Sequence, residues 1–529
     1  MAPSAASLLA AAASFAFLLS PASLSSASES LSSAVAPEGT AAAADADAVD
    51  VEYPHLTISK IAFGSCHSSK RSDNDPSAAD IWKSIAAEEP DAFLWTGDAV
   101  YARSKGDAPP SDLAAEYDRM RADADLGYAP FLERAELPGG VHGTWDDHDY
   151  GGNDRGVEAR DKIPRRDAYL DFLGVPPDDP RRSRPGVYSS VTYGRSPRKV
   201  KVIFLDTRWG RDRHCIPSVG AAKHLPLGAV AACATRWMTA GLDLHSVLPP
   251  CRRGGRRRRR RRSMLDEEQW EWLGAQLRYS DAAVHVVISS VQVLTTNPVV
   301  ESWGHFPEER ARLLGVLNGA RGAVLLSGDV HHSEVLDAGA AVAVAPSSSG
   351  EERRRGILEV TSSGLTHSCV EPFYGGVCAP ILDAFSAHRF RGDDSGGGGE
   401  NGRGGGARSF DGKFYYTGRN YGTVRLDWGR DGWRGTAPDG AETASPEASV
   451  VVDVRDRDGN VVLSTGSLNL SRSTALTEAE LSGVAPCIDG HLLPLVRRVG
   501  MTLALLCILA LGWTRRSRRV SVDEAKKTE

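Results

Sequence analysis

A chain of 529 residues has room for roughly two to four domain-sized units, and its 41% hydrophobic and 25% charged residues are typical of a globular protein. This composition excludes fibrous, collagen-like and wholly disordered proteins. The net charge of −6 argues against a generally basic nucleic-acid-binding protein. Nine of the 62 basic residues are concentrated in Arg252–Arg262, so the rest of the chain is more acidic still. We therefore expect no nucleic-acid partner.

The N-terminal residues have the pattern of a secretory signal. An apolar stretch, Leu8–Leu19, is followed by small residues that include Ala22 and Ala27, as in a short hydrophobic region and its cleavage zone. No Lys or Arg precedes this stretch, so an uncleaved anchor and a plastid transit peptide are alternatives. We expect a signal peptide at residues 1–27 and a flexible leader at residues 28–54.

An apolar segment near the C-terminus favours a membrane anchor. Val499–Trp513 would span only about 22 Å as a helix, but extension back to Leu492 makes it long enough for a bilayer. Six Lys or Arg residues follow this segment, against two just before it, which places the tail in the cytosol. We expect a juxtamembrane linker at 471–491, a transmembrane helix at 492–513 and a basic cytosolic tail at 514–529.

This arrangement predicts a single-pass type I membrane protein of the secretory pathway, with its main domain extracellular or luminal. A buried hydrophobic helix is the alternative. The eight cysteines are consistent with export, and proximity favours pairing of Cys369 with Cys378 and of Cys215 with Cys233, although sequence cannot fix the pairing. Asn469 lies in an Asn-Leu-Ser glycosylation sequon, which agrees with export.

Strand-like and helix-like segments alternate along the expected domain at residues 55–470. Short apolar runs predict strands at Leu56–Phe63, Ala92–Trp95, Val141–Trp145, Val200–Leu205, Val284–Ser289 and Val324–Ser327. Amphipathic patterns predict helices at Ala78–Glu88, Leu113–Arg121, Arg166–Leu173, Asp266–Leu277 and Pro307–Leu317. Near the end, Val450–Val454 and Val461–Ser464 flank an Asp-Gly-Asn turn and predict a β-hairpin. The alternation predicts an α/β fold in which helices cover sheets.

Three low-complexity insertions interrupt this domain at residues 252–262, 341–355 and 391–408. They are rich in Arg, in Ala and Ser, and in Gly, and none can bury enough apolar surface to fold alone. The arginine run could bind RNA, another anionic polymer or acidic lipid. Since it lies between helix signals inside the domain, we interpret it as a solvated loop.

Polar residues of metal-binding type follow four of the expected strands. The groups are Cys66-His67, Asp98 with Tyr101, Asp146–Asp149 with Asn153 and Asp154, and Asp329–His332. In open α/β sheets, active sites gather beyond the carboxyl ends of strands. Three carboxylates within four residues also repel one another unless cations or water compensate them. These patterns predict a metal site.

The residue types limit the choice of metal and of chemistry. Carboxylates and a phenolate are hard oxygen ligands that suit Fe³⁺, Ca²⁺, Mg²⁺ or Mn²⁺, whereas the thiolate of Cys66 favours iron or zinc. Two metals about 3.5–4 Å apart, bridged by a carboxylate, are the usual arrangement for hydrolysis of phosphate esters.

The motifs together resemble the PhoD-like alkaline phosphatases, a branch of the metallophosphatase (calcineurin-like) superfamily. The resemblance rests on the Gly-Ser-Cys start, Gly-Asp-x-x-Tyr, WDDHDYGGND at Trp145–Asp154 and SGDVHH at Ser327–His332, and it extends from about Ile58 to Leu365. It implies a four-layer α/β/β/α sandwich. It also implies a phosphoric ester hydrolase in which a metal-bound hydroxide attacks phosphomonoesters or phosphodiesters, with Fe³⁺ and Ca²⁺ as cofactors and Zn²⁺, Mn²⁺ or Mg²⁺ as alternatives.

The same resemblance implies roles for individual residues. The implied metal ligands are Cys66, Asp98, Tyr101, Asp147, Asn153, Asp154, Asp329 and His331. Asp98 is the implied bridge, and His148 matches the histidine that contacts the phosphoryl group or protonates the leaving oxygen. Arg208, His332 and His67 are candidates for contact with the substrate, with structural roles as alternatives. Whether Asp146, Asp149 and His332 bind metal stays open, and we expect Thr361–His367 to pack against the site.

A second reading of the sequence is a catalytically degenerate metallophosphatase fold that serves as a surface receptor or binding module. Retention of the full set of implied ligands argues against it, because a binding module needs no such set.

Overall fold

The computed structural model describes residues 50–104, 107–218, 220, 228–239, 263–320, 322–338, 357–371, 376, 378–385, 414–429, 449–469, 476–477, 481 and 484. These residues all belong to one compact unit, Ala46–Gly490. The predicted signal peptide, transmembrane helix, cytosolic tail and three low-complexity insertions lie outside the described residues. None of the helices described is both long and apolar enough to cross a membrane.

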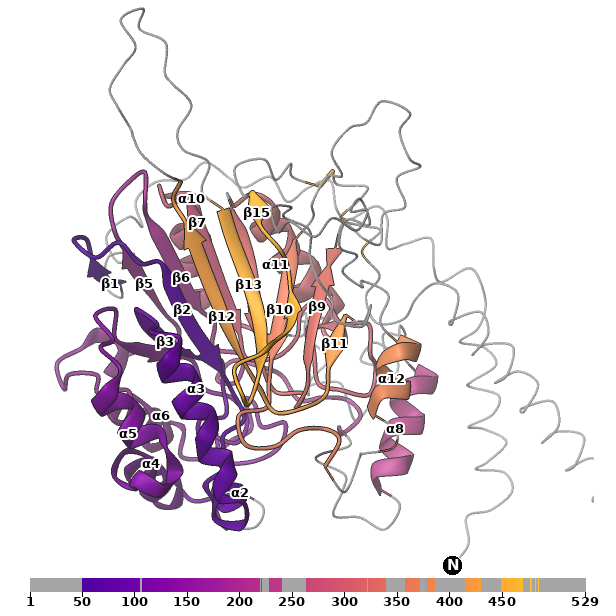
Figure 1. Ribbon diagram of the computed structural model, residues 1–529. Helices are drawn as coiled ribbons and strands as arrows, with labels where there is room; N and C mark the ends of the chain where they lie inside the picture. Colours follow the sequence, from indigo (N-terminus) through magenta and orange to yellow (C-terminus); the bar gives the residue numbers. More distant parts are fainter. Residues whose placement is uncertain are drawn as a thin grey trace, which may run out of the picture. The chain divides into compact units, whose positions relative to one another are not determined.

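Two mixed β-sheets form the centre of this unit (Figure 1). The first sheet has the order β1-β5-β6-β7-β8-β10-β9-β11. Its strands are β1 (Asp50–Tyr53), β5 (Ser189–Tyr193), β6 (Val200–Phe204), β7 (Val284–Ser289), β8 (Ala323–Ser327), β9 (Ser333–Asp337), β10 (Leu358–Ser362) and β11 (Tyr415–Tyr416). The second sheet has the order β14-β13-β12-β2-β3-β4, and β15 pairs with β13. Its strands are β2 (Lys60–Gly64), β3 (Ala92–Trp95), β4 (Val141–Gly143), β12 (Asn420–Asp427), β13 (Ser449–Asp456), β14 (Val461–Ser464) and β15 (Leu468–Asn469).

The main hydrophobic core lies between the two sheets, because alternate residues of each strand point to opposite faces. In β3, Leu94 belongs to this central core, whereas its neighbours Phe93 and Trp95 belong to a second cluster on the outer face. In β7, Val286 belongs to the central core and Val287 to a third cluster on the outer face of the first sheet. Each sheet therefore has apolar side chains on both faces and must be covered on its outer side.

Helices provide this cover on both outer faces. The second sheet is covered by α3 (Asp80–Ala87), α4 (Pro110–Ala122), α5 (Tyr128–Arg134) and α6 (Lys162–Phe172). The first sheet is covered by α10 (Glu267–Arg278) and α11 (Pro307–Asn318). The remaining described α-helices are α2 (Ser69–Asn74), α8 (Gly228–Thr239) and α12 (Cys378–Phe385). The α/β prediction is confirmed, and the layers follow the expected α/β/β/α order.

In the structure the domain begins earlier and ends later in the chain than the sequence predicts. Asp50–Tyr53, expected within a flexible leader, forms β1 and pairs in parallel with β5. Within the expected juxtamembrane linker, Leu476 exchanges two backbone hydrogen bonds with the side-chain amide of Asn318, at 2.7 and 2.8 Å. Leu476 and Val484 are also buried in the outer cluster beside α11. Burial of these apolar side chains attaches part of the expected linker to the domain.

The structure confirms one of the two expected disulfides. Cys369 is bonded to Cys378. Cys215 is also disulfide-bonded, but Cys233 carries a free thiol, so the expected Cys215–Cys233 pairing is wrong. Cys66 is free and fully buried.

Candidate metal centre

The predicted ligands lie on loops that follow β2, β3, β4 and β8. The first three of these strands are parallel neighbours in the second sheet, so their carboxyl ends meet at one edge. The loop after β8 reaches the same place from the first sheet, since Cys66 Sγ lies 3.8 Å from the backbone oxygen of Asp329. Four segments that are far apart in the sequence thus converge, as the sequence predicts.

Three overlapping groups of ligand atoms result, and within each group the atoms lie within 4.8 Å of one another. The groups are Cys66–Asp98–His331, Asp98–Asp147–His148 and Asp146–Asp147–Asp329. Asp98 belongs to two groups, and so does Asp147. A carboxylate shared by neighbouring groups is the arrangement that can bridge two cations.

The backbone at this centre adopts conformations that cost free energy. Cys66, Asp98, Asp154, Asp329 and His331 have φ angles of 62°, 51°, 55°, 70° and 59°. Each left-handed non-glycine residue costs on the order of 1–3 kcal/mol, and such residues gather at functional sites. Five of the seven described non-glycine residues with positive φ are predicted ligands of one centre, so the backbone strain is concentrated there.

The first group contains one thiol sulfur donor, one carboxylate oxygen donor and one imidazole nitrogen donor. The hydroxyl of Tyr101 donates a 2.7 Å hydrogen bond to Asp98 Oδ2 and lies 3.1 Å from His331 Nε2. Cys66 Sγ lies 3.7 Å from Asp98 Oδ2. Burial, and then the neighbouring Asp98 charge, raise the pKa of the Cys66 thiol and of the Tyr101 phenol well above their ordinary values. A bound cation would reverse this by stabilising the thiolate and the phenolate.

The third group holds carboxylate oxygens that have no hydrogen-bond partner. Among the described residues, Asp146 Oδ2 and Asp147 Oδ1 are buried and accept no hydrogen bond. Burial raises the pKa of Asp146 to about 7. Burial and the charges of Asp146 and Asp147 raise the pKa of Asp329 well above its usual range. Buried oxygens left without donors, beside other carboxylates, fit a hard cation such as Ca²⁺.

His148 lies at the exposed side of the centre. Its side chain is 23% exposed, whereas that of Asp147 is 2% exposed. Its ring stacks against Tyr101 with the centroids 3.9 Å apart, and its backbone N–H donates to Asp98 Oδ1 at 3.1 Å. The imidazole is therefore held beside the predicted ligands while it remains accessible to a molecule from solvent.

Asp149, whose role the sequence leaves open, stabilises the loops. Its two carboxylate oxygens accept four hydrogen bonds, from the backbone N–H groups of Ala99, Val100 and Asp146 and from the hydroxyl of Tyr117. These donors occupy its oxygens, so Asp149 joins the β3 and β4 loops.

Asn153 and Asp154 occupy the turn after Asp147. The backbone N–H of Asp154 donates to Asp147 Oδ2 at 2.9 Å, and the Asp154 carboxylate accepts a hydrogen bond from the backbone of Ser218 at 3.0 Å. A Cβ atom on Gly220 would lie 2.6 Å from the Asn153 amide nitrogen, so the Asn153 side chain packs against that glycine. The backbone of Asp154 thus holds the Asp147 carboxylate in place. The ligand roles of Asn153 and Asp154 stay predictions.

Arg208 does not have the free guanidinium that a phosphate clamp requires. It is fully buried; its Nε donates to Asp146 at 2.6 Å, its Nη2 also contacts Asp146, and its Nη1 lies 3.0 Å from both oxygens of Glu301. Glu301 also binds Arg211 and His214, each at 2.8 Å. Because two carboxylates already bind its guanidinium, Arg208 orients the Asp146 carboxylate.

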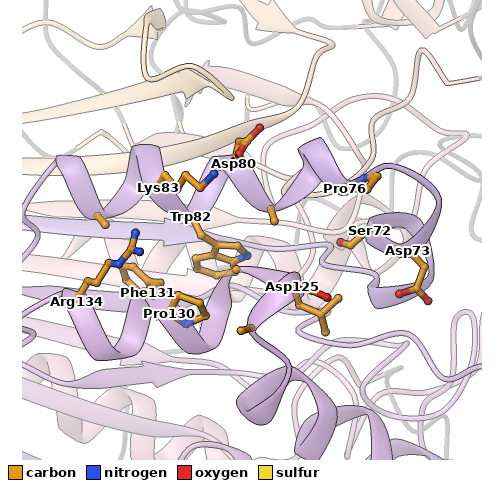
Figure 2. Close-up of a pocket in the computed structure, with 15 residues that line it drawn as sticks. Ser72, Asp73, Pro76, Asp80, Trp82, Lys83, Asp125, Pro130, Phe131 and Arg134 are labelled. Carbon is orange, nitrogen blue, oxygen red and sulfur yellow. Dashed lines mark hydrogen bonds and ion pairs between the residues drawn. The ribbon is translucent and has the colours of Figure 1, made fainter.

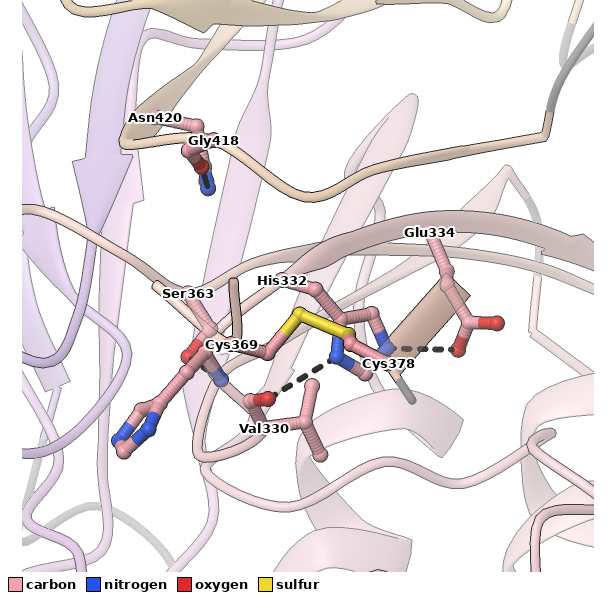
Figure 3. Close-up of a disulfide and its surroundings, with 9 residues drawn as sticks. Val330, His332, Glu334, Ser363, Cys369, Cys378, Gly418 and Asn420 are labelled. Atoms are coloured by element: carbon pink, nitrogen blue, oxygen red, sulfur yellow. Dashed lines mark hydrogen bonds and ion pairs between the residues drawn. A yellow bond between two sulfur atoms is a disulfide. The ribbon is translucent and has the colours of Figure 1, made fainter. Parts of the chain in front are cut away.

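The two histidines that are candidates for contact with the substrate, or for structural roles, are buried beside other groups. The ring of His67 lies against Trp82 and Trp95, with centroid distances of 5.8 and 6.4 Å, and burial lowers its pKa to about 4. Figure 3 shows His332 beside the Cys369–Cys378 disulfide, where its Nδ1 lies 2.9 Å from the Val330 carbonyl oxygen and its Nε2 3.4 Å from Glu334.

Two residues that sequence reasoning did not assign contact the first group. The hydroxyl of Ser363 lies 3.1 Å from Cys66 Sγ. The ring of His367 packs against His331 and Tyr101, with centroid distances of 4.3 and 5.2 Å. The one signal in the sequence was the Thr361–His367 segment, which was expected to pack against the site, and it does.

A cavity of about 670 Å³ lies elsewhere, between α3 and α5 (Figure 2). Trp82 and Phe131 line it, together with the charged Lys83 and Arg134. None of its lining residues is a predicted ligand, so this cavity is separate from the candidate metal centre.

Comparison with known proteins gives a family match and several similar solved structures. The sequence profile of the PhoD-like phosphatase family matches residues 61–379, whereas comparison with curated proteins gives no match. One similar solved structure is PhoD, at 17% identity over 82% of this chain and 78% of that chain, with a TM-score of 0.43. Another is GAP50, the anchor in the inner membrane complex of Plasmodium, at 12% identity over 82% and 96%, with a TM-score of 0.35.

A third is the purple acid phosphatase PPD1 from yellow lupin (Lupinus luteus) seeds, at 11% identity over 81% of this chain and 57% of that chain, with a TM-score of 0.36. The family match covers more than half of the 529 residues. The chain therefore belongs to the PhoD-like phosphatase family.

Proposed function

We propose that the protein is an exported, membrane-anchored, metal-dependent phosphatase that hydrolyses phosphomonoesters, phosphodiesters or both. Membership of a phosphatase family supports the reaction class and implies metal dependence. The observation that carries the proposal is the chain of three donor groups joined through Asp98 and Asp147.

The chemistry of the donors favours two different cations. Cys66, Tyr101 and His331 would hold one metal together with Asp98, and this set of sulfur, phenolate and imidazole donors suits Fe³⁺. Asp147, with its unpartnered Oδ1, would hold a second metal with Asp329, and an all-carboxylate set suits Ca²⁺. When bound, such metals polarise the phosphoryl oxygens and lower the pKa of a bound water.

The protein groups position the reaction around these ligands. Arg208 and Ser290 both donate to Asp146 Oδ1, which fixes that carboxylate and leaves its other oxygen facing the third group. His148 is a partly exposed residue of the centre, and we assign to it the proton that the leaving oxygen receives when the P–O bond breaks. Its stacking on Tyr101 keeps the ring beside the place where the ester would bind.

Hydrolysis of para-nitrophenyl phosphate and of its bis ester tests this function. Chelated, Ca²⁺-supplemented and Fe³⁺-loaded protein would be compared, with Asp98→Asn as the variant and Asp125→Asn, outside the predicted centre, as the matched control. We expect turnover that chelation abolishes, that Asp98→Asn removes and that Asp125→Asn retains. Unchanged turnover in Asp98→Asn would contradict the mechanism, and no turnover in folded, metal-loaded protein would favour the binding-module alternative.

Export and anchoring are a separate part of the proposal. The Cys369–Cys378 disulfide and the oxidised Cys215 support an oxidising compartment, and the apolar segment before the basic tail supports the anchor. Extraction of expressing cells with alkaline carbonate, followed by protease treatment of intact cells, tests this. We expect the protein to stay in the membrane pellet and its main domain to be digested from outside; release by carbonate would contradict anchoring.

A further inference from the structure

A single hydroxyl connects two of the predicted ligand loops. Ser363 directly follows β10, and its Oγ lies 3.1 Å from Cys66 Sγ. The same oxygen accepts a 2.8 Å hydrogen bond from the backbone N–H of His331. Ser363 therefore contacts the sulfur donor on the β2 loop and the backbone of the nitrogen donor on the β8 loop.

The number of protons fixes the direction of these bonds. An N–H can only donate, so Ser363 is the acceptor toward His331, and its own hydroxyl proton stays available for another partner. A metal ligand at Cys66 must be a thiolate, which can only accept. The Ser363 hydroxyl then donates its proton to Cys66 Sγ, and both of its contacts are satisfied at once.

We propose that Ser363 is a positioning residue that orients the Cys66 thiolate toward the metal and weakens its electron donation. The inference rests on the proposed function, because that function makes Cys66 a ligand. It goes further, because it assigns a specific role to a residue outside the predicted ligand set.

The segment that carries Ser363 is fixed to both ligand loops. The backbone N–H of Leu365 donates to the Ser65 carbonyl at 3.1 Å, and the N–H of Cys369 donates to the His331 carbonyl at 2.7 Å. The Cys369–Cys378 disulfide holds the end of the segment, as Figure 3 shows together with Ser363. Because the segment is attached on both sides, the Ser363 hydroxyl has little freedom to leave the sulfur.

Loss of this hydrogen bond has an optical consequence. A hydrogen bond to a thiolate withdraws electron density from sulfur, and hydrogen bonds of this kind tune metal–sulfur centres. Without the bond the sulfur donates more easily, so the sulfur-to-metal charge-transfer band moves to longer wavelength. Loss of a hydrogen-bond partner of a ligand typically also lowers metal affinity by roughly 10- to 100-fold.

The test uses the full chain loaded with Co²⁺ or Fe³⁺, with absorption spectra and metal titrations of each variant. Ser363→Ala should shift the sulfur-to-metal band to longer wavelength and weaken metal binding by about 10-fold or more, whereas Ser363→Thr should retain the wild-type band. Ser362→Ala is the matched control, because Ser362 is equally buried but donates its hydroxyl to Asn420 at 2.8 Å. An unchanged band and affinity in Ser363→Ala would overturn the proposal.

A measurement on the wild-type protein tests the proposal even if the Ser363→Ala variant does not fold. Exchange into D₂O should shift the metal–sulfur stretch in the resonance Raman spectrum, because the hydroxyl proton that Ser363 donates to the thiolate is exchangeable; no shift would overturn the proposal. The Cys66→Ser variant distinguishes failure of this proposal from failure of the proposed phosphatase function. If the wild type and Cys66→Ser lack the band alike, Cys66 is not a ligand and the proposal fails, while phosphatase turnover still reports on the function itself.

Discussion

Tyr101 and Asp98 share a proton at the candidate metal centre: the phenol donates to Asp98 Oδ2 over 2.7 Å. Asp98 is buried and Tyr101 is partly buried, and burial raises the pKa of each well above its ordinary value. The proton therefore stabilises a carboxylate that would otherwise be an uncompensated buried charge. A cation at this position would take over that role, which explains why two acidic groups lie so close together.

Tyr101→Phe should weaken Fe³⁺ binding by about 10-fold or more, because it removes the hydroxyl that contacts Asp98 and His331. The ring remains, so its packing against His148 and the fold should persist. Metal titration measures the affinity, and circular dichroism checks the fold. Tyr188→Phe is the control, since Tyr188 lies in the outer cluster of the first sheet. Equal affinity in both variants would show that the Tyr101 hydroxyl is no ligand.

The positions of the ligand loops were predictable because each follows a short apolar run. Of these runs, Ala92–Trp95 coincides with β3, and Val324–Ser327 lies within β8; strand ends determine where the next polar side chains can gather. Strands β9 and β12 were harder to predict. β12 contains Gly422 and charged residues, and β9 (Ser-Glu-Val-Leu-Asp) has only two apolar residues, so neither has the apolar run that marked the others.

Two histidines show how little the sequence determines about side-chain direction. His67 follows Cys66, and His332 follows His331; in each pair the first residue belongs to a ligand group, whereas the second packs against other groups. Proximity in sequence to a ligand therefore left both substrate contact and a structural role open for the second residue. The surroundings of Arg208 were not predictable either, since its partner Glu301 is 93 residues away and no local pattern predicts that pairing.

Metal removal should make stability depend on pH. Burial raises the pKa of Asp146 to about 7, of Asp149 to about 6 and of Asp154 to about 7. Because these values lie above the ordinary value of about 3.9, the folded state holds protons more tightly than the unfolded state. The stabilisation is complete below about pH 4 and is lost as the pH rises through 6 and 7.

Thermal unfolding of chelated protein between pH 5 and pH 8 measures this effect. We expect the Tm to fall as the pH rises, and we expect added Ca²⁺ and Fe³⁺ to raise the Tm more at pH 8 than at pH 5, because cations compensate the ionised carboxylates. A Tm of the chelated protein that is equal or higher at pH 8 would contradict the prediction.

Removal of the Arg208 guanidinium should destabilise the protein strongly. Arg208→Met leaves Asp146 and Glu301 buried without their common partner, and breaking a buried ion pair typically costs about 3–5 kcal/mol. Arg312→Met is the control, because the Arg312–Glu267 pair is exposed, with side-chain exposures of 41% and 68%, and such pairs contribute about 1 kcal/mol or less. Urea unfolding measures the free energy of unfolding of both variants. Similar losses in the two variants would show that the buried ion pair contributes no more than the exposed one.

The role assigned to His148 predicts a dependence on the leaving group. A group that donates a proton matters most when the departing oxygen is strongly basic, as in phenyl phosphate, and least when it is weakly basic, as in para-nitrophenyl phosphate. His148→Gln should therefore slow phenyl phosphate hydrolysis by about 10²- to 10⁴-fold and para-nitrophenyl phosphate hydrolysis much less.

The comparison uses kcat for both esters with fully metal-loaded protein, and His55→Gln, at an exposed position outside the centre, serves as the control. Because the backbone N–H of residue 148 still donates to Asp98 in the variant, the metal content should not change. Equal slowing of the two esters would mean that His148 orients the phosphoryl group instead of protonating the leaving oxygen, since orientation affects both substrates alike.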